Sequence, residues 1–288
     1  MAVIRKVVFP VAGLGTRMLP ATRVLPKEML PVVDKPIIQY AFEEAAEAGC
    51  EEFVFVTGRG KTLIEDHFDR AYELFDSLAR KAKEKELAAL EEATPKAGGI
   101  VYTRQQQPLG LGHAVWCARH AVGDEPFGVM LVDDLIHSRT PCMAQLADAH
   151  ARTGGNIVAV MEVAAEHTAR YGVLDPGKDD GLLVEVRGMV EKPKPAEAPS
   201  RLAVIGRYIL MPEIFDLLAR QQKGAGGEIQ LTDSMAKLIG KQPFHGLRFE
   251  GRRFDCGDKQ GYLEAIVALA LERQDLSQEF GNTLRRYL

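Results

Sequence analysis

KVVFPVAGLGTR, at residues 6–17, is the stretch that decides the fold. Its first part, residues 6–11, is a β-rich apolar run, and the glycines that follow allow the chain to turn sharply. A strand that is apolar along its whole length is typical of a sheet covered by helices on both faces. The stretch therefore predicts an α/β fold.

Helical and strand patterns alternate after this stretch, which indicates crossover connections between parallel strands. We therefore expect a mostly parallel mixed sheet flanked by helices. The expected strands lie at residues 53–56, 100–103, 127–132, 156–163, 182–191 and 203–211. The expected helices lie at residues 36–49, 61–92, from 113, 213–220, 231–239 and 259–273.

The composition excludes several classes of protein. The chain has 288 residues, a formal net charge of -4 and a pI near 6.0, so no basic surface for nucleic acid is indicated. The cysteines are scattered without a C-x-x-C pair, which argues against a zinc or redox site. No leader pattern and no apolar run long enough to span a bilayer are present. We expect a soluble, cytoplasmic protein that does not bind membranes.

The glycine loop at residues 12–17 suits an anion, because glycines let backbone N–H groups approach a ligand closely. It is not a P-loop, since no G-K-[ST] follows, and Met18 stands where a dinucleotide fingerprint has its third small residue. An ordinary tight turn would carry the same glycines. Arg17 and Lys27, however, place two cations beside the loop, as a triphosphate requires.

The glycine loop is the first of several motifs that occur in a fixed order along the chain. They are VAGLGTR at 11–17, PKEMLP at 26–31, IEDHFD at 64–69, PLGLGHA at 108–114, GEIQLTD at 227–233 and FDCG at 254–257. Together they resemble the motifs of the sugar-nucleotide pyrophosphorylases, and among these the branch that uses UTP. The resemblance covers nearly the whole chain. It implies a Rossmann-like sheet of the nucleotide-diphospho-sugar transferase type.

The resemblance also implies a reaction: UMP passes from UTP to glucose 1-phosphate, giving UDP-glucose and pyrophosphate with the help of Mg²⁺. It implies a homo-oligomer, either a dimer or a tetramer. The chain would be one domain, with a nucleotide-binding half at about 1–135, a sugar-phosphate-binding half at about 136–258 and C-terminal helices at about 259–288.

Residue roles on the nucleotide side follow from the same resemblance. Arg17 and Lys27 would hold the triphosphate and act in catalysis, while the nucleotide would lie against Ala12, Gly13, Leu14 and Gly15. Gln107 and Gly112 would recognise uracil, since a glutamine amide offers both a donor and an acceptor. An exposed loop residue and a plain helix-start turn are the alternatives for these two positions. His113 is interpreted as a helix-start residue, because a sugar phosphate needs no general base.

For the metal, the resemblance implies Asp133 and Asp255 as ligands. Asp133 follows a buried strand, where α/β sheets bind ligands, and Mg²⁺ takes one or two carboxylates plus phosphate oxygens. Asp134 is an adjacent competitor. Asp255 has an alternative as the cap of the helix that begins near Asp258.

On the sugar side, the resemblance gives Gly172 and Glu191 to the glucose and Lys192 to the sugar phosphate, where Lys192 would also be catalytic. The alternative is a solvated charged turn. Two other functions remain open: a related pyrophosphorylase with another nucleotide or sugar phosphate, and a non-catalytic sugar-nucleotide sensor. The latter would be expected to lack one of the cations or carboxylates, and all are present.

Overall fold

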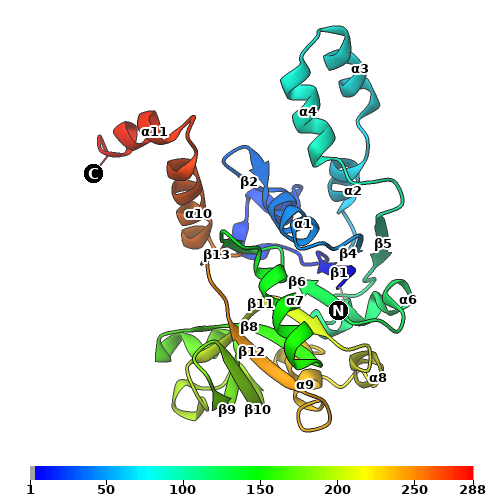
Figure 1. Ribbon diagram of the computed structural model, residues 1–288, viewed down its shortest axis with the longest axis vertical. Helices are drawn as coiled ribbons and strands as arrows, with labels where there is room; N and C mark the ends of the chain where they lie inside the picture. The colour runs from blue at the N-terminus through cyan, green and yellow to red at the C-terminus, as the bar shows by residue number, and fades with distance from the viewer. Residues whose placement is uncertain (1–3, 288) are drawn as a thin grey trace.

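The computed structural model describes residues 4–287, and a nine-stranded mixed sheet forms its centre (Figure 1). The strand order is β5-β4-β1-β6-β11-β8-β12-β10-β9. Its strands are β1 Lys6–Pro10, β4 Glu52–Thr57, β5 Ile100–Arg104, β6 Phe127–Met130, β8 Asn156–Glu162, β9 Gly172–Asp179, β10 Leu183–Glu191, β11 Leu202–Leu210 and β12 Phe244–Arg248. The α/β mixed sheet predicted from the sequence is confirmed.

Parallel pairing is confined mainly to one side of this sheet. β5, β4, β1 and β6 are parallel neighbours, as the apolar strands of the first half predicted. From β6 to β11 the pairing becomes antiparallel, and beyond it only β8 and β12 run parallel. The carboxyl ends of β1, β4, β5 and β6 therefore share one edge, where ligand sites of α/β sheets lie.

Helices cover both faces of the sheet. In β1, Val7 and Phe9 pack into one core with α1 and α7, whereas Val8 packs into a second core with α5 and α8. The helices are α1 Ile37–Glu47, α2 Thr62–Phe68, α3 Tyr72–Arg80, α4 Glu84–Ala93, α5 Leu111–Cys117, α6 Arg119–Val122, α7 Cys142–Thr153, α8 Ile214–Leu218, α9 Leu231–Ala236, α10 Lys259–Glu272 and α11 Ser277–Leu284. No helix among the described residues is long and apolar enough to cross a membrane.

Two small sheets lie outside the main one. β2 Pro31–Val32 pairs with β3 Lys35–Pro36, and β7 Asp134–His137 pairs with β13 Arg252–Asp255. The second pairing brings residues 252–255 beside the segment that follows β6. The strand expected at 127–132 ends earlier than predicted, and the chain turns at 131–133 before β7 begins.

The single long helix expected at 61–92 is wrong, because three helices, α2, α3 and α4, occupy this segment. Figure 1 shows α3 and α4 side by side in an arm that projects from the sheet. The break between them is at Ala82, whose φ is 49°, and Lys83 N–H bonds to the Leu78 carbonyl. This is the hydrogen bond of a Schellman cap, with alanine at the position where glycine is usual.

Candidate functional site

A cavity of about 480 Å³ opens between the two sides of the sheet. Segments that follow β1, β6 and β10 line it, together with β13 and the loop before α9. Of the residues predicted from the sequence, Arg17, Asp133, Gly172, Glu191, Lys192 and Asp255 all line this one cavity. The Lys27 ammonium contacts Asp133, which lines the cavity. The predicted phosphate, metal and sugar residues thus come from distant parts of the chain to one place.

The first loop wraps around the Lys27 side chain. A Cβ on Gly13 would lie 3.7 Å from Lys27 Cε, and one on Gly15 would lie 3.1 Å from Lys27 Cβ. Gly15 also has a φ of 66°, a left-handed conformation that favours glycine. Leu14 points into solvent, with 71% of its surface exposed. The two glycines therefore let the loop close over the stem of this lysine.

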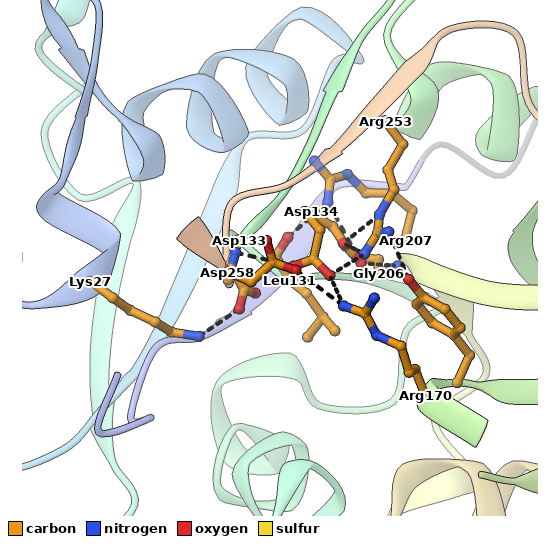
Figure 2. A network of polar contacts seen from close by, with 12 residues as sticks. Lys27, Leu131, Asp133, Asp134, Arg170, Gly206, Arg207, Arg253 and Asp258 are labelled. Carbon is orange, nitrogen blue, oxygen red and sulfur yellow. Dashed lines mark hydrogen bonds and ion pairs between the residues drawn. The ribbon is translucent and has the colours of Figure 1, made fainter. Parts of the chain in front are cut away.

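Lys27 and Asp133 form an ion pair inside the site, with Lys27 Nζ 2.6 Å from Asp133 Oδ2 (Figure 2). Burial by itself lowers the pKa of Lys27, but the Asp133 and Glu28 carboxylates together outweigh burial, and the pKa of Lys27 lies above its usual value. Burial raises the pKa of Asp133, yet Lys27 brings it below its usual value. Both groups are therefore charged at neutral pH.

Asp134, the competitor of Asp133, has its carboxylate engaged elsewhere. Oδ2 accepts a 2.9 Å bond from the Gly206 N–H, and Oδ1 accepts a 2.7 Å bond from Arg253 Nε (Figure 2). Arg253 also donates to the Tyr171 hydroxyl at 3.0 Å. Asp134 thus lines the cavity as part of a buried network, while Asp133 pairs with Lys27.

Asp255 is brought to Asp133 by β13. The Cys256 N–H donates to the Asp133 carbonyl at 2.8 Å, which joins the end of β13 to the turn after β6. A Cβ on Gly257 would lie 2.9 Å from Asp133 Oδ2 and 3.0 Å from Asp255 Oδ1. The two carboxylates therefore converge on one small space that glycine leaves open.

This pair of carboxylates fits a divalent cation that takes its other ligands from phosphate. No cluster of three or more His, Cys, Asp or Glu side chains suited to a metal occurs within residues 4–287. A site for a metal held by protein alone is therefore not found in this part of the chain. The capping role considered for Asp255 falls to Asp258, whose Oδ1 accepts from the Gly261 N–H at 2.9 Å.

The predicted sugar residues meet where β9 and β10 pair. Glu191 is opposite Gly172 in the ladder, and a Cβ on Gly172 would lie 3.3 Å from Glu191 Oε2. Lys192 has a φ of 46°, rare for a residue with a side chain, and its Nζ lies 3.2 Å from Glu191 Oε1. Such backbone strain clusters at functional sites, although Ala82 shows that a helix cap can also carry it.

Gln107 and Gly112, predicted to recognise uracil, lie apart from this arrangement. Gln107 is exposed and lines a separate depression with Trp116. The Gly112 N–H donates to the Ile229 carbonyl at 2.8 Å, and a Cβ there would lie 2.8 Å from the same oxygen. Gly112 thus packs closely against the segment before α9, a contact that the sequence did not indicate. The uracil-binding roles of both residues remain predictions.

Gln105, which sequence reasoning missed, is the buried glutamine of this loop. It follows β5 directly, and its amide nitrogen lies 3.0 Å from the Gly110 carbonyl and 3.1 Å from His113 Nδ1. β5 neighbours β4, whose following residue Gly58 packs on Ala12. The position of Gln105 at the carboxyl end of β5 was the available signal in the sequence.

Two arginines near Asp255 were also missed. Arg170 donates 3.1 Å bonds to Asp255 and to Asp258, and Arg253 Nη2 lies 3.5 Å from Asp255. Arg253 and Asp255 are two residues apart in β13, which puts both side chains on one face of that strand. The two-residue spacing was the available signal for Arg253, but residues 252–255 were not expected to form a strand.

Comparisons with known proteins identify the family of this chain. Residues 6–272 match the nucleotidyl transferase family. A UTP–glucose-1-phosphate uridylyltransferase of Komagataeibacter xylinus is 54% identical over 256 residues, 89% of this chain and 90% of the relative. The UTP-bound enzyme of Acinetobacter baumannii superposes with a TM-score of 0.90 at 39% identity and covers 98% of each chain. A UDP-glucose pyrophosphorylase in complex with UDP-glucose gives a TM-score of 0.84 at 43% identity, covering 94% of this chain and 100% of that one.

Proposed function

Because the chain belongs to the nucleotidyl transferase family, we propose that its cavity transfers UMP from UTP to glucose 1-phosphate with the help of Mg²⁺. The chain is a nucleotidyltransferase, and the products of its reaction are UDP-glucose and pyrophosphate. The observation that supports the residue roles is the meeting of Lys27, Asp133, Asp255 and Lys192 around one cavity.

In the proposed reaction, an oxygen of the sugar phosphate attacks the α-phosphorus of UTP in line. A new P–O bond forms while the bond to the β-phosphate breaks, and pyrophosphate leaves. Catalysis of this kind depends on positioning and on compensation of charge. Lys192 would hold the incoming phosphate, and Arg17 and Lys27 would stabilise the charge that develops on pyrophosphate.

Asp133 and Asp255 would hold the Mg²⁺, since their oxygens converge beside Gly257. When bound, the ion would offset the repulsion between the two phosphate groups. Lys27 lies on Asp133 Oδ2 and would turn toward the triphosphate. Among the described residues, Arg17 makes no salt bridge, so its guanidinium is available to an anion.

The reaction is tested by a substrate panel that measures pyrophosphate release. UTP, dTTP and CTP are each paired with glucose 1-phosphate and with a second sugar phosphate, in Mg²⁺ and in excess EDTA. We expect UTP with glucose 1-phosphate to give the highest kcat/KM, and EDTA to abolish release. A higher value with another nucleotide would reassign the substrate. Tight binding without release from any pair would indicate a sugar-nucleotide sensor.

The metal ligand is tested by Asp133→Ala. We expect this change to abolish Mg²⁺-dependent release and to weaken binding of Mn²⁺ in the presence of UTP, measured by electron paramagnetic resonance. Asp134→Asn is the matched control, because its carboxylate is bonded to Arg253 and the Gly206 N–H. It should lower thermal stability and leave Mn²⁺ binding within about twofold. Retained activity in Asp133→Ala would move the metal to another group.

The assembly as a homo-oligomer remains a prediction. Its test is the mass of the protein in solution by light scattering, where a dimer or a tetramer is expected.

A further inference from the structure

Lys27 and Glu28 are neighbours on the short turn Lys27–Met29, yet their side chains lie in different surroundings. Lys27 faces the cavity through Asp133, whereas the Glu28 side chain is only 1% exposed. Lys61 Nζ lies 2.6 Å from Glu28 Oε2, and the Lys61 side chain is 6% exposed. A buried ion pair therefore stands directly behind the proposed phosphate-binding lysine.

A buried ion pair contributes little net free energy to holding two segments together. The free-energy cost of removing two charges from water can cancel the attraction between them. Two apolar side chains of similar size often stabilise a fold equally well. Moreover, Glu28 Oε1 is buried and has no hydrogen-bond partner among the described residues. What a charged contact adds over an apolar one is a defined geometry, because it is short and directional.

The pair connects two loops of the nucleotide side. Lys61 immediately precedes α2 and follows the loop after β4. In that loop Gly58 packs on the first glycine loop, since a Cβ on Gly58 would lie 3.2 Å from the Ala12 carbonyl oxygen. The Lys61–Glu28 contact thus fixes the turn of Lys27 against the segment that supports Ala12.

We propose that Glu28 and Lys61 are positioning residues for nucleotidyl transfer: they hold the turn at 27–29 so that the Lys27 ammonium points at the outer phosphates of the nucleotide. Neither residue contacts the substrate. The inference rests on the proposed phosphate-binding role of Lys27.

The experiment compares binding of UTP and UMP by isothermal titration calorimetry, because UMP lacks the two outer phosphates. The test variant is Glu28→Leu combined with Lys61→Met, which removes both charges and leaves neither buried alone. We expect UTP affinity and kcat to fall about tenfold or more, as small misplacements of a catalytic group do, while UMP affinity stays within about twofold. Glu28→Gln, which keeps the side-chain shape, provides the same comparison if the double variant does not fold.

A double-mutant cycle separates positioning from other effects. In a Lys27→Met background, removal of the pair should not weaken UTP binding further, since the group it positions is absent. Ile64→Ala is the control for lost stability, because Ile64 is fully buried in α2 and lies outside the pair. It should lower Tm and leave the ratio of UTP to UMP affinity unchanged.

Two results would overturn the inference: equal losses of UTP and UMP affinity in the pair variant, or the same loss of UTP affinity in the Lys27→Met background. Unchanged UTP binding in Lys27→Met alone is a different failure. It would remove the phosphate-binding role of Lys27, and the inference with it, while the substrate panel would still identify the reaction.

Discussion

The α-carbon of Gly257 faces the space between Asp133, Asp255 and Arg17. A Cβ there would lie 2.9 Å, 3.0 Å and 3.1 Å from a polar side-chain atom of each. The backbone of Gly257 is outside the left-handed region, so an alanine meets no conformational strain. The need for glycine is therefore a need for empty space between charged groups.

We predict that Gly257→Ala lowers kcat about 100-fold, because the methyl group would separate three groups that we propose converge on the phosphates. The measurement is pyrophosphate release, with Tm recorded beside it, and Tm should change little. Gly188→Ala is a matched control, since a Cβ there would meet Asp175 Cβ at an ordinary 3.5 Å. Normal turnover in Gly257→Ala would show that the three groups do not act together.

At the scale of elements, the β9 edge of the sheet is held to β12 by an ion pair. Arg248 in β12 donates two 2.8 Å hydrogen bonds to Asp179 in β9, and these bonds lower the pKa of Asp179 to about 2. An unfolded aspartate has a pKa of about 3.9, so folding favours the ionised form. This contribution to stability is present above about pH 4 and is lost as the pH falls toward 2.

We therefore predict that Asp179→Asn has a lower Tm than the parent chain at pH 6, and that the difference closes as the pH approaches 2. The effect should be small, since both side chains are about one-third exposed and solvent screens the pair. Salt provides the control, because 1 M NaCl should narrow the difference at pH 6. A difference in Tm that is independent of pH would assign the effect to shape instead of charge.

Elements with one clear hydrophobic period or one long apolar run were predictable from the sequence. The buried strands at 6–10 and 202–210 and the helix at 259–272 lie close to their predicted positions. Prediction failed where polar residues form strands, as in β9 with GVLDPGKD and β13 with RRFD, because these depend on partners distant in the sequence. The break at Ala82 was unpredictable for a similar reason, since no glycine marks it.

At the scale of the whole molecule, a buried ion pair joins the first helix to the second side of the sheet. Arg207 in β11 contacts Glu44 in α1 at 2.7 Å, and the two side chains are 1% and 9% exposed. Glu44 Oε1 also accepts from the Met143 N–H at the start of α7. One carboxylate thus links three elements from separate parts of the chain.

We predict that Glu44→Leu destabilises the protein by about 3–5 kcal/mol, because Arg207 would remain buried without a counter-charge. Urea unfolding followed by circular dichroism gives the measurement. The control is the exposed ion pair of Arg252 and Glu264. The double variant Arg252→Met with Glu264→Leu should lower the free energy of unfolding by less than about 1 kcal/mol. A loss below about 1 kcal/mol in Glu44→Leu would mean that water reaches Arg207.

The candidate site was predictable in part for the same physical reason as the fold. Asp133 follows a buried parallel strand, and the rule that ligands bind at the carboxyl ends of strands applies to it directly. Arg253 and Asp255 come from a strand that pairs only with β7, outside the main sheet. The buried pair of Glu28 and Lys61 depends on a contact across 33 residues, and no local pattern indicates it.

The change from parallel to antiparallel pairing between β6 and β11 has an evolutionary consequence. The glycine loop and Lys27 belong to the parallel side, whereas Gly172 and Lys192 belong to β9 and the end of β10. Substitutions that alter one wall of the cavity therefore need not disturb the strands that carry the other. Under the residue roles proposed above, selection for a new sugar can act on one set of loops while the loops for the nucleotide are inherited unchanged, so descendants of one ancestor can diversify in one substrate at a time.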